Sequence, residues 1–536
     1  MPGRRTARLR LSCAAVALAA VIAGCGSITA AAPRRAHSNL ISIIEAEGFL
    51  HDDPPQALAT FDSMGVDEVR VFLPWSSFAP DPTASTAPAF DADDPAAYPP
   101  EDWGQLDEIV RDAAAVGIGL DLTLGGPVPN WAIGPGAPLG SPYDIGWMPS
   151  AHRFGQFVHA VAERYSGHYV PPGATSPLPR VSFWSIWNEP NYGHYLSPQA
   201  IGQVEVAPRV YRGLVDAAWS ALLATGHTPG HDTILIGETA PRGVAGPGLP
   251  GDFGGMMPLR FVRALYCVNA AFQPLRGRAA RVRGCPASAS ARRSFVAGNP
   301  ALFQASGFAD HPYPDALAPN VRTLDVPGDS DYADFAALSN LESTLGRAGA
   351  AFGQRDRLPI YSTEFGYRTN PPTSLGVPLR TAALYLNQSE YLSWRNPRIH
   401  SYDQYLLSDP IAGAKTDFDT GLEFGNGRPK PYVYDAYRMP MYLPITHGHR
   451  GARLEVWGCV RPAPVFAART DHPQQVRIQF EAAGTTRYRT VRTVRLTDAH
   501  GYFDTLVRFP GSGQVRLQWS GSGHPLLSRT QAISLS

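Results

Sequence analysis

Short apolar segments alternate with amphipathic helical segments along this chain, and the alternation repeats eight times. Strand-like segments separated by helical ones predict parallel β-α-β units. Eight such units predict a (β/α)8 TIM barrel with long loops. A doubly wound open sheet is the alternative, but no glycine-rich phosphate-binding turn follows the first apolar segment. The predicted strands are 41–47, 68–73, 119–124, 181–187, 233–237, 307–311, 359–363 and 399–406.

The pattern changes after residue 443. Five segments then alternate apolar and polar residues and are separated by Gly-containing turns, which predicts an antiparallel β-sandwich at 452–536. We therefore expect a barrel at 38–443, with an insertion at about 242–300, followed by this sandwich. The sandwich either binds polysaccharide or braces the barrel, and the lack of an evident row of aromatics favours bracing. The predicted barrel helices are 55–64, 103–116, 151–165, 208–225, 258–268, 332–349, 378–394 and 430–442.

Length and charge exclude several classes of protein. At 536 residues the chain is too long for one ordinary domain, and its 44% hydrophobic content excludes a chain that is disordered throughout. Lys and Arg number 46, as do Asp and Glu, so the net charge is zero. The balance gives no electrostatic case for a nucleic-acid partner or for direct binding to a membrane surface.

The first 32 residues are predicted to be a targeting signal. Four arginines precede an apolar stretch at 11–23, which is too short to span a bilayer. The run Ile-Ala-Gly-Cys at 22–25 resembles a lipobox, in which Cys25 would be lipidated, whereas the alanines at 30–32 form an ordinary cleavage site. An uncleaved segment is the third alternative. Each alternative places the protein outside the cytoplasm, with membrane contact only through a lipid anchor.

Cysteine usage agrees with export. Cys267 and Cys285 lie 18 residues apart in a segment rich in Pro, Gly and Arg, which predicts a local disulfide in an oxidising compartment. Cys459 then stands alone, as a small buried apolar residue. The sequence has no C-x-x-C motif, and its histidines lack metal-ligand spacing, so we expect neither a metal nor a cofactor.

Two glutamates stand where predicted strands end. Glu189 follows the fourth strand and Glu364 the seventh. The carboxyl ends of barrel strands form the catalytic face, and a carboxylate there loses hydration unless it is paired or used. Either glutamate alone is explained equally well as a helix-cap neighbour or an ion-pair partner. Both together, on strands 4 and 7, predict a catalytic pair.

The surrounding residues, Trp-Asn-Glu-Pro at 187–190 and Thr-Glu-Phe-Gly at 363–366, resemble motifs of glycoside hydrolase clan A, the retaining (β/α)8 glycosidases. Within the clan, the chain looks most like families 39 and 5, over about residues 40–440. The resemblance implies double-displacement hydrolysis of O-glycosidic bonds in a β-linked poly- or oligosaccharide or glycoside. It implies that Glu189 is the acid/base and Glu364 the nucleophile, and that Asn188 binds the sugar 2-hydroxyl.

Other substrate-binding residues follow from the same resemblance. Arg70 corresponds to an arginine on strand 2 beside the nucleophile, while His311 and Tyr313 end strand 6, where the clan supplies a His or Tyr to that carboxylate. Where the clan commonly ends strand 8 with a tryptophan under the sugar, this chain has Tyr405 nearby, which is a departure from the pattern.

Three further residues have two interpretations each. Trp75 and Trp131 either stack on a sugar or fill the core. Glu238, at the end of the fifth strand, either contacts substrate or forms a structural ion pair.

Retaining hydrolysis requires two carboxyl groups about 5–5.5 Å apart, one that attacks the anomeric carbon and one that protonates the leaving oxygen. A carbohydrate-binding pseudoenzyme of the cell envelope on the same fold is the alternative function, and a structural envelope protein is a third. The sugar, and exo or endo action, depend on loops whose shape the sequence does not reveal. Nothing in the sequence indicates an oligomeric state.

Overall fold

The structure is a computed structural model, and it describes residues 40–138, 144–244, 248–322, 331–355, 357–410, 418–521 and 523–536. The predicted signal, with Cys25, lies outside the described residues. Among the described helices, none is both long and apolar enough to cross a bilayer.

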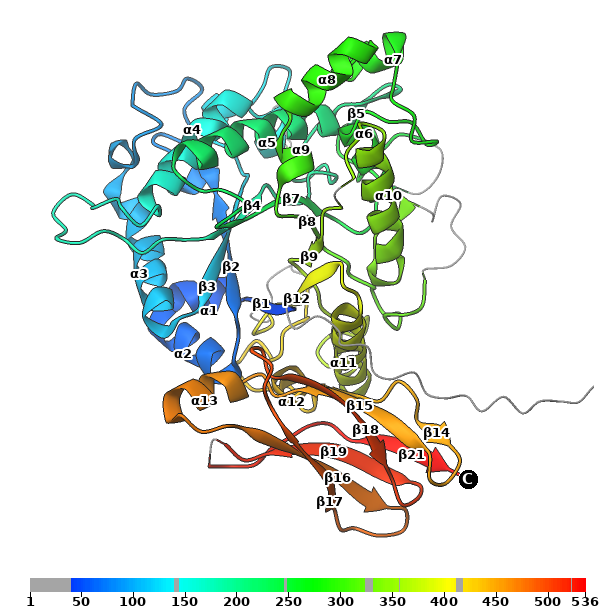
Figure 1. Cartoon of the computed structure of the whole chain (residues 1–536). Helices are drawn as coiled ribbons and strands as arrows, with labels where there is room; N and C mark the ends of the chain where they lie inside the picture. Colours follow the sequence, from blue (N-terminus) through cyan, green and yellow to red (C-terminus); the bar gives the residue numbers. More distant parts are fainter. Residues whose placement is uncertain are drawn as a thin grey trace, which may run out of the picture. The chain divides into compact units, whose positions relative to one another are not determined.

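Eight parallel strands close into a barrel (Figure 1), as the alternating pattern predicted. Each strand pairs with the next barrel strand along the chain, and the last pairs with the first, where Ile43 lies opposite Asp403. The predicted strands agree with the observed ones to within two or three residues at each end. They are β1 (Ile41–Glu45), β2 (Glu68–Pro74), β3 (Gly119–Gly125), β4 (Phe183–Ile186), β7 (Thr233–Thr239), β8 (Gly307–Asp310), β9 (Ile360–Ser362) and β12 (Ile399–Tyr405).

Helices alternate with these strands, and local signals set several of their ends. The side chain of Asp53 caps the first barrel helix by accepting a hydrogen bond from the Gln56 N–H, and Gly65, with φ of 75°, ends it. The predicted helix at 332–349 begins later, at Leu338, and the one at 430–442 is only six residues long. The barrel helices are α2 (Pro54–Met64), α3 (Pro100–Val116), α4 (Ala151–Arg164), α5 (Ala207–Ala224), α6 (Pro258–Leu265), α10 (Leu338–Ala350), α11 (Leu379–Arg395) and α12 (Val433–Arg438).

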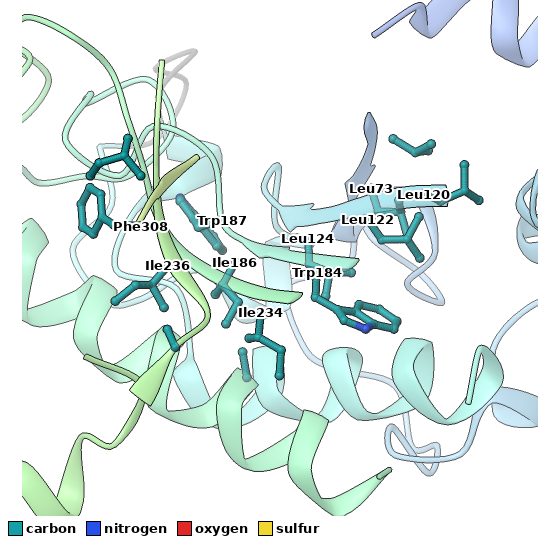
Figure 2. Packing of buried hydrophobic residues seen from close by; sticks show 14 of the residues in the cluster. Leu73, Leu120, Leu122, Leu124, Trp184, Ile186, Trp187, Ile234, Ile236 and Phe308 are labelled. Carbon is teal, nitrogen blue, oxygen red and sulfur yellow. The ribbon is translucent and has the colours of Figure 1, made fainter. Parts of the chain in front are cut away.

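Residues on both faces of the barrel strands are mostly buried, because both faces of a parallel barrel are covered. Figure 2 shows this packing for β3, β4 and β7. The side chains of Leu122, Leu124, Trp184, Ile186 and Ile234 are all fully buried there. This core holds the strands rigidly, so the residues at their carboxyl ends are presented on a fixed frame.

The connection between β7 and β8 carries extra helices beyond α6, namely α7 (Gly277–Val282), α8 (Ala289–Gly298) and α9 (Ala301–Gln304). A disulfide joins Cys267 to Cys285 across this segment. Cys459 is a free, fully buried cysteine.

Two β-sheets follow the barrel and enclose a second apolar core, which gives the predicted β-sandwich. The sequence pattern missed a helix, α13 (Ala463–Thr470), the five-residue strand at Gln531–Leu535 and several two-residue strands. One sheet contains β13 (Met441–Tyr442), β15 (Arg453–Cys459) and β18 (Tyr502–Arg508). The other contains β14 (His447–Gly448), β21 (Gln531–Leu535), β19 (Gly513–Trp519), β16 (Gln475–Ala482), β17 (Arg489–Arg495) and, paired with β19, β20 (Leu526–Leu527).

The sandwich shares buried surface with the barrel. Trp457, Cys459 and Tyr502 belong to the same apolar cluster as the barrel helices. A buried ion pair joins Arg461 to Glu390 of α11, with 2.7 Å between Nη2 and Oε1. The two parts are therefore continuous in the core.

Candidate active site

Glu189 and Glu364 both lie just beyond the carboxyl ends of barrel strands, β4 and β9 respectively. The chain leaves β4 through an unusual backbone, in which Trp187 and Glu189 both have positive φ, 73° and 40°. Such conformations are unfavourable for these residues and persist only where the surroundings enforce them. Here the buried Trp187 ring packs against Phe154, and the backbone N–H of Trp187 donates to the Leu124 carbonyl. The turn therefore aims Glu189 into the mouth of the barrel.

The two carboxylates face one another. One oxygen of each, together with a ring nitrogen of His311, forms a group in which all atoms lie within 4.8 Å of one another. The side chains are mostly buried but reachable, at 17% exposed for Glu189 and 12% for Glu364. The ends of β4 and β9, the fourth and seventh strands of the barrel, thus bring together the two glutamates that the sequence predicted to be a pair.

Arg70 of β2 organises the floor of the site. Its Nη1 donates to Glu364 Oε1 at 2.9 Å and also to Glu45, and its Nη2 donates to Asn188 Oδ1 at 2.9 Å and to Glu238 Oε2 at 3.2 Å. Burial by itself lowers the pKa of Arg70, but the carboxylates of Glu45, Glu364 and Glu238 outweigh it and raise the pKa well above the usual value. The guanidinium is therefore a permanent positive charge beside Glu364.

His311, at the end of β8, contacts both members of the pair. Its Nδ1 lies 3.1 Å from Glu189 Oε1 and 3.4 Å from Glu364 Oε2, and its Nε2 lies 2.8 Å from Glu238 Oε2. Burial lowers the pKa of His311, but these three carboxylates raise it well above its usual value. The three carboxylates therefore favour the protonated form of His311. The family resemblance predicted that His311 lies beside Glu364, whereas its shortest contact with the two glutamates is the one to Glu189.

Glu364 is held by several donors but is also deeply buried. Tyr313 donates its hydroxyl to Glu364 Oε2 at 3.1 Å. Burial raises the pKa of Glu364, the positive charges of His311 and Arg70 oppose the rise, and the carboxylate of Glu189 adds to it, with a net upward shift. Its ionisation therefore depends on the cations and hydroxyl around it.

The contacts of Glu238 agree with a structural ion pair, which is one of the two roles predicted for it. It is fully buried, its φ is 48°, and its Oε2 accepts from Arg70, His311 and the Thr363 hydroxyl, the last at 3.1 Å. It lines neither of the two cavities that Glu189 lines. It holds the two cations in place from behind.

A cavity of about 310 Å3 opens above the pair. Sequence reasoning predicted five of its lining residues and missed the others. Glu45 could have been found, because it ends an apolar strand as Glu189 and Glu364 do. The loop aromatics gave no such signal. The predicted lining residues are Arg70, Asn188, Glu189, Glu364 and Tyr405, and the missed ones are Glu45, Phe72, Tyr192, His194, Tyr195 and Phe418.

The two predicted tryptophans lie elsewhere. Trp75 is 1% exposed and packs against Trp131, Phe154 and Phe157, which agrees with the core-filling interpretation of the two that the sequence leaves open. Trp131 is half-buried and donates its indole N–H to the Pro80 carbonyl, away from the described cavity walls. The packing of the loops sets the positions of both tryptophan side chains, and this packing cannot be predicted from the local sequence.

A second cavity, of about 410 Å3, adjoins the first. Its walls come from the loops after β4, β7, β8, β9 and β12, and it shares Glu189 and Phe418 with the first cavity. Glu364 lines only the first cavity.

Glu189, His311 and Glu364 also offer three atoms in metal-ligand geometry. A cation is disfavoured there because both ring nitrogens of His311 already face carboxylates and the Arg70 guanidinium lies 2.9 Å from Glu364. The arrangement suits proton transfer and nucleophilic attack by carboxylates instead.

No family model and no curated protein matches this chain. Solved structures do. A family 39 glycoside hydrolase from Bacteroides cellulosilyticus WH2 is 13% identical, with a TM-score of 0.43, over 88% of this chain and 80% of that one. A glucosidase from Croceicoccus marinus is 12% identical (TM-score 0.47; 92% and 96% covered), and an endo-beta-1,4-mannanase from Thermotoga petrophila is 11% identical (TM-score 0.37; 93% and 97%). At these identities no residue role transfers, so roles must come from the geometry of this chain.

Proposed function

We propose that this protein is a retaining glycoside hydrolase that acts on a β-linked sugar by double displacement. The carrying observation is the carboxylate pair, whose facing oxygens lie within 4.8 Å of one another. Retaining enzymes place their carboxyl groups about 5–5.5 Å apart, whereas inverting enzymes need about 6.5–9.5 Å to admit a water molecule. The separation supports direct attack by one carboxylate.

The surroundings support different roles for the two glutamates. Glu364 has the Arg70 guanidinium at 2.9 Å and the Tyr313 hydroxyl at 3.1 Å, both of which stabilise its ionised form, as the nucleophile requires. Glu189 lies at the junction of two cavities, where a leaving group can be reached. We therefore take Glu364 as the nucleophile and Glu189 as the acid/base.

The chemistry then proceeds in two steps. Glu364 attacks the anomeric carbon while Glu189 gives its proton to the leaving oxygen, and a glycosyl ester forms on Glu364. Glu189, now a carboxylate, takes a proton from water, which attacks the same carbon and releases the sugar. Asn188 is positioned for the sugar 2-hydroxyl, because its Oδ1 is bound by Arg70 and its amide NH2 remains as a donor.

The lining of the first cavity also supports a sugar as ligand. Its aromatic side chains provide flat apolar surface and its charged groups provide donors and acceptors for hydroxyls. Phe72, Tyr192, Tyr195, Tyr405 and Phe418 are the aromatic residues that line it.

The test is chemical rescue of alanine variants with azide on an activated aryl β-glycoside. Glu364→Ala should lose at least about a thousandfold in kcat, and azide should restore product as the α-glycosyl azide. Glu189→Ala should be milder, accumulate glycosyl-enzyme and yield the β-glycosyl azide, because the two carboxylates act on opposite faces of the sugar.

Glu68→Gln is the matched control, since Glu68 begins β2 at the opposite end of the barrel and lines neither of these two cavities. Swapped azide stereochemistry would exchange the two roles. Full activity in either alanine variant would refute the assignment. The pseudoenzyme alternative predicts no turnover and no covalent labelling by an activated 2-fluoro-glycoside.

We also propose that the protein works outside the cytoplasm, lipid-anchored at Cys25 or freely secreted. The disulfide between Cys267 and Cys285 supports an oxidising compartment. Changing Cys25 to Ser should move the protein from the membrane fraction to the soluble fraction if the anchor exists. If the wild type and the variant distribute in the same way between the two fractions, the lipid anchor is excluded and free secretion is the remaining alternative.

A further inference from the structure

Glu189 stands between two cavities of different chemistry, whereas Glu364 lines only one of them. We propose that the second cavity holds the leaving group, and that this group is a neutral sugar bound by a cluster of Asp315, Arg368 and Arg242. The inference rests on the proposed function and deepens it, because it makes the substrate an oligosaccharide or polysaccharide rather than a glycoside of an apolar alcohol.

The orientation of the substrate across the two cavities follows from the atom that each carboxylate must contact. The sugar under attack must lie against Glu364, and therefore in the first cavity. The leaving oxygen must lie against Glu189, and the rest of the leaving group must extend away from Glu364. Of these two cavities, the second meets both conditions, since its wall includes Glu189 but not Glu364.

The wall of this cavity carries an ionic cluster on three different loops. Arg368, after β9, donates to Asp315 Oδ1 at 2.6 Å, and Arg242, after β7, lies 3.5 Å from Asp315 Oδ2 and 3.7 Å from Asp334 Oδ2. The side chains remain accessible, with 47% of Asp315, 30% of Arg242 and 28% of Arg368 exposed. The cavity thus presents oriented donors and acceptors side by side.

The charge balance selects among leaving groups. The guanidiniums of Arg242 and Arg368 face the carboxylates of Asp315 and, outside the cavity wall, Asp334, so these four groups together carry no net charge to attract an anion. An apolar group would strip water from these charges without replacing their hydrogen bonds. Adjacent sugar hydroxyls can both donate to Asp315 and accept from the guanidiniums. A neutral sugar is therefore the ligand that satisfies the cluster.

The experiment compares two substrates with the same sugar in the first cavity. One is a β-linked oligosaccharide found by screening, and the other is its 4-nitrophenyl glycoside, which has an aryl leaving group. Asp315→Ala and Arg368→Met should each lower kcat/KM for the oligosaccharide by about ten- to a hundredfold, the effect of losing a hydrogen bond to a charged group. Activity on the aryl glycoside should change by less than about threefold.

Asp435→Ala is the matched control, because Asp435 forms a surface pair with Arg438 of similar exposure on α12 and lines neither of these two cavities. It should leave both activities unchanged. Equal losses on the two substrates, or no loss on either, would overturn the inference while the proposed function stands. Wild-type preference for a uronate over a neutral leaving group would also overturn it. Absence of wild-type turnover on both substrates would refute the proposed function and this inference together.

Glycosyl transfer gives a second readout that needs no oligosaccharide substrate. A sugar bound in the second cavity can attack the anomeric carbon of the glycosyl ester, so that the bond to Glu364 breaks, a glycosidic bond forms and the hydroxyl proton passes to Glu189. Asp315→Ala should lower transfer to an added sugar, measured against transfer to methanol, by about tenfold. An unchanged ratio would contradict the proposed pocket.

Discussion

His311 and Arg70 give the site its charge before any ligand is present. Each lies between the carboxylate pair and Glu238, which is fully buried and accepts hydrogen bonds from both. Such groups do not have to reorient when charge develops on the sugar, and this preorganisation is the largest source of catalysis in many enzymes. These cations, together with the Tyr313 hydroxyl, oppose the rise in the pKa of Glu364 that its burial causes.

This balance predicts the behaviour of Tyr313→Phe. The hydroxyl of Tyr313 donates to Glu364 and stabilises only the ionised carboxylate, so its loss should raise the pKa of Glu364 beyond the rise that burial already causes. A protonated Glu364 cannot attack. The acid limb of kcat/KM should therefore move to higher pH by about one unit, equivalent to about 1.4 kcal/mol. A pH profile on an activated aryl glycoside measures the shift.

Tyr367→Phe is the control for this variant, because it removes a buried hydroxyl that donates to the Leu317 carbonyl rather than to the pair. Its acid limb should coincide with that of wild type. An acid limb unmoved in Tyr313→Phe, or moved to lower pH, would mean that the hydroxyl does not support the ionised form.

At the scale of elements, the predictable part of the molecule is the part that periodicity encodes. The eight barrel strands could be read from the sequence because burial on both faces requires runs of apolar residues. Glu189 and Glu364 could be placed because strand ends in a barrel converge on one face, whereas Arg70, inside β2, could be placed only through the family resemblance. Glu45 also lies at the end of a barrel strand, but no recognisable motif surrounds it.

Loop residues could not be placed in this way. For Trp75 the sequence leaves sugar stacking and core filling equally open, and the structure shows that the chain turns after β2 and buries the ring against α4. Tyr192 and Tyr195 reach the cavity because Asn191 anchors their loop through hydrogen bonds to Ala240 and Met256. These contacts join segments about 50 to 65 residues apart, and no local pattern predicts them.

For the whole molecule, the buried pair of Arg461 and Glu390 decides whether the barrel and the sandwich unfold together. Both side chains are 1% exposed, and Glu390 also accepts from the Tyr502 hydroxyl at 2.9 Å. Removing one partner of such a pair leaves a buried charge uncompensated. Because Trp457 and Tyr502 lie in the barrel core as well, we expect one cooperative transition.

Arg461→Met should lower the free energy of unfolding by about 3–5 kcal/mol at neutral pH. Burial already raises the pKa of Glu390, and without Arg461 the rise becomes larger. The folded state then binds a proton more tightly than the unfolded state, so the loss of stability should grow as pH rises above the unfolded value of about 4.3 and shrink below it. Urea denaturation followed by tryptophan fluorescence at several pH values measures this dependence.

The double variant Arg461→Met/Glu390→Gln should recover much of the loss and most of its pH dependence, since no buried charge remains. Two separate unfolding transitions in wild type would instead show that the sandwich and the barrel are independent units. A pH-independent loss in Arg461→Met would point to packing rather than charge.

The division between the two cavities has a consequence for how such a protein can change over evolution. Arg70 and Glu238 lie within barrel strands, and Glu364 and His311 directly follow them, whereas Asp315, Arg368 and Arg242 lie further out on three separate loops. Insertions and substitutions accumulate in loops without disturbing the frame beneath them. Exchange of these loops could therefore change the substrate specificity of such a protein during evolution, while the reaction itself stays the same.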